Sequence, residues 1–185
     1  MRKCNSIVSI VLVILLLIHL FIGAFVMLDI ISFSPAWKKV LSVAMVVLLL
    51  AHIVMGTILT IKSIRITNKS SKKYLGLNKK FWISRISAFL IIILGVYHIY
   101  FFMNKGNQGI RLKTFEEFQL LASIVFVLAI LVHIITNIKS TIISLGIEKV
   151  RKFSTNMGVV LLIVFIGALV AFVWYYIRWN ILWRL

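Results

Sequence analysis

The sequence predicts an all-α integral membrane protein with five transmembrane helices, and two observations support this fold class. Hydrophobic residues make up 62% of the 185 residues, with a mean hydropathy of +1.10, whereas soluble domains are close to half apolar. Apolar runs of about 20 residues, the length that crosses a bilayer, recur five times. No stretch is long or polar enough for a soluble domain, so we expect a single transmembrane domain over residues 1–185.

The five expected spans follow one another with short loops between them. They cover residues 7–28, 40–61, 82–103, 119–140 and 155–177. The first run is too long for a signal peptide and no small-residue cleavage pattern closes it. Ser34 and Pro35 begin the turn before the second span, and glycines and asparagines between residues 104 and 109 mark the third loop. Trp37 and Trp82 fall near span ends, as interfacial aromatic residues do.

The charge distribution predicts an orientation. The net charge is +17 with only four acidic residues, and the basic residues lie mostly in loops, which favours anionic lipid or an acidic partner over nucleic acid. Fourteen lysines and arginines fall on the side of the N-terminus, the 62–81 loop and the 139–152 loop, with Arg85 just inside the third span counted among them, against seven on the other side. The positive-inside rule then predicts a cell-membrane protein of a bacterium or archaeon with a cytoplasmic N-terminus and an external C-terminus.

The four histidines are the main functional signal. His19, His52, His98 and His133 each lie inside one of the first four spans, and the fifth span has none. Ionisable residues inside a membrane are rare and usually face the bundle interior. A single membrane histidine can simply hydrogen-bond a neighbouring helix. Zinc would need three or four ligands at one depth, and a proton relay would more naturally include carboxylates, which the span interiors lack.

Depth separates the histidines into two pairs. At 1.5 Å per residue from the cytoplasmic end of each span, His19 and His98 lie roughly 18 and 24 Å up, and His52 and His133 lie roughly 13 and 10 Å up. We call His19 and His98 the outer pair, and His52 and His133 the inner pair. In an up-down bundle of the first four helices, the members of each pair face one another diagonally. Two opposed imidazoles at each of two depths suit two b haems with six-coordinate iron.

Small residues accompany the histidines. Gly23 and Gly56 each follow a histidine by four residues, and Gly95 precedes His98 by three, so each shares a helix face with its histidine. We expect these glycines to admit the flat haem ring close to the helix, although small residues also serve helix packing. The only cysteine, Cys4, excludes a CxxCH site, so the haems would be held non-covalently.

Haem propionates need cationic partners near the membrane surface. The candidates are Lys38, Lys39, Lys105, Arg111 and Lys113 for the outer haem, and Lys62, Arg65, Arg85 and Lys139 for the inner haem.

Five spans, one histidine in each of the first four, a cytoplasmic N-terminus and an external C-terminus together resemble a known family. The chain looks like the dihaem cytochrome b membrane anchor of succinate:quinone oxidoreductases, the succinate dehydrogenases and fumarate reductases. The resemblance implies that His19 and His98 ligate the distal haem and that His52 and His133 ligate the proximal one. It also implies a flavoprotein with covalent FAD and an iron–sulfur protein docked on the cytoplasmic face, where the basic 62–81 loop is a candidate dock.

The resemblance further implies a menaquinone site near the distal haem, with an acidic residue that handles protons. Asp29, at the outer end of the first span, is the candidate, and Glu116 and Glu117 are the runners-up. The chain departs from the family in its short length and in the absence of a glutamate within the spans, which puts a transmembrane proton path in doubt.

We therefore expect a non-flavin subunit that carries electrons between a quinone pool and a cytoplasmic dehydrogenase. Two alternatives stay open. One is a haem b anchor for another oxidoreductase, of the hydrogenase or formate dehydrogenase type, and the other is a haem-free transporter or assembly protein.

Overall fold

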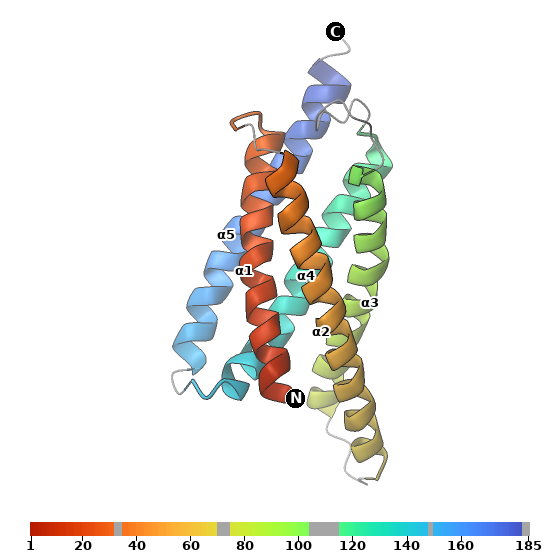
Figure 1. Cartoon of the computed structure of the whole chain (residues 1–185), viewed down its shortest axis with the longest axis vertical. Coiled ribbons are helices and arrows are strands. Elements are labelled where there is room, and N and C mark those ends of the chain that lie inside the picture. Colours follow the sequence, from red (N-terminus) through yellow and green to blue (C-terminus); the bar gives the residue numbers. More distant parts are fainter. Residues whose placement is uncertain (32–34, 70–74, 104–114, 148–149, 183–185) are drawn as a thin grey trace.

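The computed structural model is all-helical and describes residues 1–31, 35–69, 75–103, 115–147 and 150–182 (Figure 1). Its helices are α1 (Arg2–Met27), α2 (Pro35–Lys69), α3 (Leu75–Met103), α4 (Glu117–Ser144), α5 (Val150–Ile177) and the short π-helical turn η1 (Arg178–Leu182). Each of the five long helices contains a segment that is long and apolar enough to cross a membrane. The predicted all-α fold with five apolar helices is therefore confirmed.

The helices extend beyond the predicted spans. α2 continues to Lys69 and α3 begins at Leu75, so most of the expected 62–81 loop is helical, and describing it as a loop was wrong. Lysine and arginine are good helix formers, and a helix does not have to stop where the apolar run stops. Hydropathy therefore located the edges of the apolar segments, while the helices themselves run further.

Two helices end in the same hydrogen-bonded motif. After α1, the amide of Ile30 donates to the Phe25 carbonyl and that of Asp29 to the Val26 carbonyl; after α4, Ile147 and Gly146 repeat the pattern. This is the Schellman motif, whose turning residue is left-handed and is usually glycine. Gly146 has φ +80° as expected, but the same position after α1 holds Asp29 with φ 61°.

α1, α4 and α5 contact one another, while α2 packs against α1 and α3 packs against α4. Within the described residues, α2 and α3 do not approach each other closely along their backbones. Figure 1 shows α1 between α2 and α5, with the N-terminus and the C-terminus at opposite ends of the molecule. The fifth helix thus packs directly against two of the four histidine-bearing helices.

The buried core lies mainly between α4 and α5. Its fully or nearly fully buried members are Phe115, Val127, Ile130, Leu161, Phe165, Phe172 and Tyr175. On α5, residues 161, 165, 168, 172 and 175 are buried at alternating spacings of four and three, which puts them on one helix face. That spacing is visible in the sequence and predicts a packed face on the fifth helix even though it carries no histidine.

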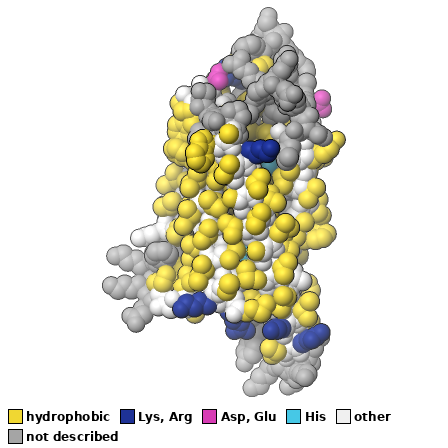
Figure 2. Space-filling view, viewed as in Figure 1, with side chains coloured by type: hydrophobic (Ala, Val, Ile, Leu, Met, Phe, Trp, Pro, Cys, Tyr) yellow, Lys and Arg dark blue, Asp and Glu magenta, His cyan; other side chains and the backbone are white. Residues whose placement is uncertain are grey.

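The outer surface is apolar around the middle of the molecule. Exposed isoleucine, valine, leucine and phenylalanine side chains occur on all five long helices. Figure 2 shows a wide yellow belt, with most dark-blue basic side chains at the end where the N-terminus lies and magenta acidic side chains at the opposite end. An apolar belt between charged ends is the surface expected of a multi-pass membrane protein.

Candidate functional site

The structure brings the four histidines together as two pairs. The ring centroids of His19 on α1 and His98 on α3 lie 6.4 Å apart with an interplanar angle of 72°. Those of His52 on α2 and His133 on α4 also lie 6.4 Å apart, at 87°. The depth of each histidine along its span predicts the same two pairs. The backbones of α1 and α3, and those of α2 and α4, are not packed neighbours among the described residues. The role of the histidines as iron ligands stays a prediction.

Ser9 on α1 holds the imidazole of His52. The Ser9 hydroxyl donates to the Asn5 carbonyl at 2.7 Å, and Ser9 Oγ lies 3.2 Å from His52 Nδ1. A serine hydroxyl has one proton and two acceptor lone pairs. Because the proton is used on Asn5, Ser9 Oγ accepts from the imidazole, and Nδ1 of His52 carries the hydrogen.

Ser84 and Ser87 on α3 hold the imidazole of His133 in the same way. His133 Nδ1 lies 3.1 Å from the Ser84 carbonyl oxygen and 3.2 Å from Ser87 Oγ, while the Ser87 hydroxyl donates back to the Ser84 carbonyl at 3.1 Å. A carbonyl oxygen only accepts. Nδ1 of His133 therefore carries the hydrogen too, and Nε2 is its unprotonated nitrogen.

Asn137 ties this region of α4 to α3. Its amide nitrogen lies 2.8 Å from Ser84 Oγ and donates to the His133 carbonyl at 2.7 Å, while its amide oxygen accepts from Ser84 Oγ at 3.0 Å. Asn137 follows His133 by four residues and so shares its helix face. The result is a polar network between two apolar helices, centred on the backbone and side chain of Ser84.

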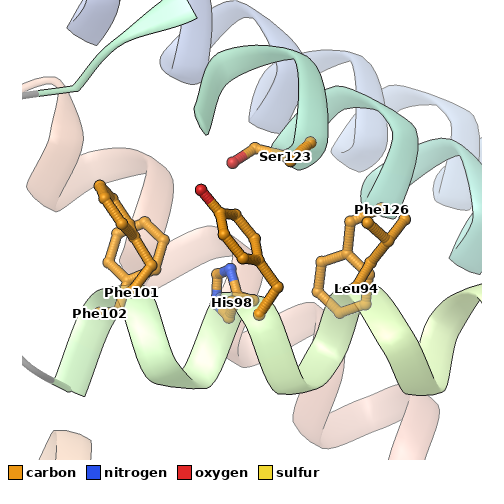
Figure 3. A pocket seen from close by; sticks show the side chains of 8 residues that line it. Leu94, His98, Phe101, Phe102, Ser123 and Phe126 are labelled. Atoms are coloured by element: carbon orange, nitrogen blue, oxygen red, sulfur yellow. The ribbon is translucent and has the colours of Figure 1, made fainter. Parts of the chain in front are cut away.

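The surroundings of the outer pair are aromatic. The ring centroid of His98 lies 4.5 Å from that of Phe102 and 5.3 Å from that of Phe126. Within the described ranges, neither His19 nor His98 makes a hydrogen bond. A small cavity borders His98, with Leu94, Phe101, Phe102, Ser123 and Phe126 around it (Figure 3). The two pairs therefore have the same spacing, but oxygen atoms hold the inner rings whereas aromatic rings pack against His98 of the outer pair.

The glycines near the histidines differ in what surrounds them. A side-chain carbon added at Gly23 or Gly56 would meet no atom within 4 Å, whereas one at Gly95 would lie 3.7 Å from the Phe126 ring. Close helix packing is the usual reason for small residues in membrane helices. At Gly23 and Gly56 no described neighbour approaches closely, so helix packing does not explain these two glycines.

Only some of the lysines and arginines that are candidate partners of haem propionates lie within the described residues. Lys105, Arg111 and Lys113 lie outside the described residues, as does the side chain of Lys38. Lys39, Lys62, Arg65 and Lys139 are exposed. Arg85 is half-buried, stacks its guanidinium 5.0 Å over the Phe81 ring, and has a buried Nε without a hydrogen-bond partner among the described residues.

The acidic candidates lie at the end of the molecule opposite the N-terminus. Asp29 accepts from Arg178 Nη2 at 2.9 Å, with exposed fractions of 50% for the aspartate and 23% for the arginine. Glu117 Oε1 lies 3.4 Å from the Tyr176 hydroxyl, and Glu116 precedes the first turn of α4 without capping it through its side chain. Asp29 is thus the acidic candidate that forms an ion pair with η1.

The sequence interpretation missed Ser9, Ser84, Ser87 and Asn137. Each is a polar residue near a histidine-bearing face, and a search for polar side chains within the spans would have found them. Their partners are on other helices, so their hydrogen bonds to the histidines required the fold. Comparison of the chain with family models, curated proteins and solved structures finds no match.

Proposed function

We propose that the chain is a dihaem cytochrome b. It anchors a succinate dehydrogenase or fumarate reductase in the membrane and carries electrons between a quinone pool and a cytoplasmic flavoprotein and iron–sulfur protein. The observation that supports the haem sites is the pairing of four histidines from four helices, with both pairs at a centroid distance of 6.4 Å. The enzyme assignment rests on the family resemblance of the sequence.

The spacing fits iron held between two imidazoles. Metal–nitrogen bonds to histidine of about 2.0–2.1 Å, added to about 1.1 Å from each nitrogen to its ring centre, separate two opposed ring centres by about 6.2–6.4 Å. The interplanar angles of 72° and 87° are compatible with this arrangement, because each ring can turn about the nitrogen–iron axis. Two pairs with the same spacing at two depths favour two equivalent cofactors.

The donor set fits haem better than zinc. Among the described residues, no three His, Cys, Asp or Glu side chains gather as a metal-binding group, whereas zinc sites need three or four protein ligands. Haem brings four nitrogens of its own, so two imidazoles complete its coordination. Nδ1–H of His52 and of His133 is directed to an oxygen, the arrangement usual for histidines that bind metal through Nε2.

The open surroundings of Gly23 and Gly56 leave room for a flat cofactor beside α1 and α2. Both glycines share a face with a histidine, and no described atom lies within 4 Å of a side-chain carbon built there. In addition, the backbone of α2 approaches only that of α1 among the described helices. A ring held by His52 and His133 would provide further contact between α2 and α4.

The bound haems supply reversible one-electron transfer, and the chain supplies ligation and surroundings. Two histidines per iron would leave no open coordination position, so these residues favour electron transfer over oxygen binding. The aromatic neighbours of His98 give the outer site an apolar wall. Arg85, with its unpartnered buried Nε, is the candidate counter-charge for an inner haem propionate.

Asp29 is the proposed proton acceptor of a quinone site at the outer surface, with menaquinone as the expected substrate. Quinone reduction and oxidation move protons together with electrons, so a carboxylate within hydrogen-bond reach is needed. Asp29 retains 50% exposure while paired with Arg178, which leaves its carboxylate accessible. Its left-handed backbone is a conformation in which glycine would cost less, which favours a reason for the carboxylate beyond chain folding.

Absorption spectra of membranes that contain the chain with its flavoprotein and iron–sulfur partners test the proposal. We expect b-type bands that succinate reduces or fumarate reoxidises, and both responses to stop when the flavoprotein is removed. Bands that respond to neither substrate would support the hydrogenase or formate dehydrogenase alternative. A chain without b-type bands would support the haem-free transporter or assembly protein, in which the histidines only bond neighbouring helices.

A further inference from the structure

The inner and outer histidine pairs have the same spacing but differ in what holds their rings. In the inner pair, Nδ1 of each ring meets an oxygen on another helix: Ser9 Oγ for His52 and the Ser84 carbonyl for His133. No hydrogen bond orients the outer rings within the described part of the chain, and His98 is instead packed against Phe102 and Phe126. The two pairs therefore also differ in how far their surroundings determine which ring nitrogen carries the hydrogen.

Counting protons at the inner pair assigns the tautomer of both rings. The Ser84 carbonyl cannot donate, so His133 Nδ1 must. The Ser9 proton is committed to the Asn5 carbonyl at 2.7 Å, so His52 Nδ1 donates as well. Each neutral ring then has its lone pair on Nε2, and Nε2 of neither ring makes a hydrogen bond within the described residues. Each ring of this pair, with the centroids 6.4 Å apart, then has one lone pair and no proton on Nε2.

We infer that Ser9 is a positioning residue for the inner pair, which with the Ser84 carbonyl fixes both imidazoles in the Nε2-ligating tautomer before iron binds. This inference rests on the proposed function, because it concerns how tightly one of the two proposed haems is held. Outer-shell partners of metal-binding histidines fix the ring tautomer and raise ligand basicity, and their loss typically weakens metal binding by about 10- to 100-fold. The outer pair lacks this support.

Two consequences distinguish the sites. The inner site holds haem more tightly than the outer one, because its rings do not have to choose a tautomer and orientation on binding. The Ser9 contact also lowers the reduction potential of the inner haem, since a more basic ligand stabilises the ferric form. Ser9 acts on the inner site only, because its contact is with His52 alone of the four histidines.

The test is Ser9→Ala in two backgrounds that isolate one haem each. His98→Ala leaves the inner haem, and His133→Ala leaves the outer one. We measure the rate of haem transfer to an apo-globin acceptor and the midpoint potential by redox titration. In the His98→Ala background we expect about 10- to 100-fold weaker haem retention and a higher potential. In the His133→Ala background we expect no change.

Ser9→Thr keeps the hydroxyl and should restore both readouts. Ser123→Ala in the His98→Ala background is the matched control. The Ser123 hydroxyl also donates to a carbonyl four residues earlier, at 2.7 Å, but it lies beside the outer pair and not the inner one. Ser9→Ala that binds the inner haem as tightly and at the same potential as the parent would overturn the inference while leaving the dihaem proposal intact. A parent chain that binds no haem would overturn both.

Discussion

The imidazole of His133 on α4 is held 3.1 Å from the backbone carbonyl of Ser84 on α3, through Nδ1. This contact joins two apolar helices with a group that cannot change its hydrogen-bonding role. It directs the other nitrogen, Nε2, away from that bond, and the ring of His52 lies 6.4 Å away, centroid to centroid. Four histidines in a chain of 185 residues are thus arranged as two pairs, and the predictions below follow from that arrangement.

Gly56→Leu and Gly23→Leu should each remove one haem without unfolding the chain. No described atom lies within 4 Å of a side-chain carbon at either site, so the apoprotein has room for the new side chain. The leucine would instead occupy space beside the histidine on the same helix face. Haem content per chain should fall from two to one in either variant, while circular dichroism stays helical.

Gly158→Leu and Gly167→Leu are the matched controls for the glycine variants. Both positions also have nothing within 4 Å of an added carbon, but they lie on α5, which has no histidine. We expect both controls to keep two haems. Equal haem loss in all four variants would mean that leucine disturbs the helices generally and that Gly23 and Gly56 have no special relation to a cofactor.

Asp29→Asn and Asp29→Gly should separate a role in quinone chemistry from a role in folding. The exposed ion pair with Arg178 contributes about 0–1 kcal/mol. Glycine relieves the left-handed backbone at φ 61°, so the stability of Asp29→Gly should stay within about 1 kcal/mol of the parent. Both variants should keep two haems and lose quinone turnover, measured with a soluble quinol and fumarate.

Arg178→Gln is the companion variant for the Asp29 prediction. It removes the salt bridge and keeps the carboxylate, so quinone turnover should be largely retained. Full turnover in Asp29→Asn would show that Asp29 is an interfacial residue without a proton-transfer role, and attention would pass to Glu117, which contacts Tyr176.

Cys4 provides a native probe of orientation. It is the only cysteine, it is exposed and free, and it lies at the end predicted to be cytoplasmic. A membrane-impermeant maleimide should label it in inverted vesicles and not in intact cells. As a control, Ile181→Cys in a Cys4→Ser background should show the opposite pattern. Labelling of Cys4 in intact cells would reverse the orientation and place the proposed dock outside.

Phe165→Ala should destabilise the helix assembly through the core between α4 and α5. The Phe165 side chain is 1% exposed. Because lipid is as apolar as the core, the loss is mainly that of packing contacts, and at about 24 cal/mol per Å³ of cavity it amounts to about 2 kcal/mol. Ile166→Ala, on the neighbouring lipid-facing position with 58% exposure, should cost much less in unfolding measurements in detergent.

The sequence alone predicted the number and type of helices because hydropathy and length determine them. It did not predict that α2 and α3 continue through the basic region around Lys69 and Leu75, because apolar runs mark membrane depth rather than helix ends. It also did not predict that α5 packs against both α1 and α4, although the spacing of Leu161, Phe165 and Phe172 on one face indicates a packed helix.

For the candidate site, helix rise along the spans was enough to group His19 with His98 and His52 with His133. The contacts of these residues could not be predicted in the same way. Ser9 lies near the start of α1 and bonds a histidine on α2, and its relation to His52 depends on how the two helices are rotated. The rotation of each helix about its own axis is determined by its packing against other helices. The residue pattern of a single helix does not contain that information.

The haem content of the purified chain and of its histidine variants tests the central claim most directly. We expect two b haems per parent chain, one in His52→Ala, one in His98→Ala and none in the double variant. The remaining haem should differ in potential between the two single variants, because the two sites have different surroundings. A parent chain without haem, or single variants that both keep two, would contradict the account.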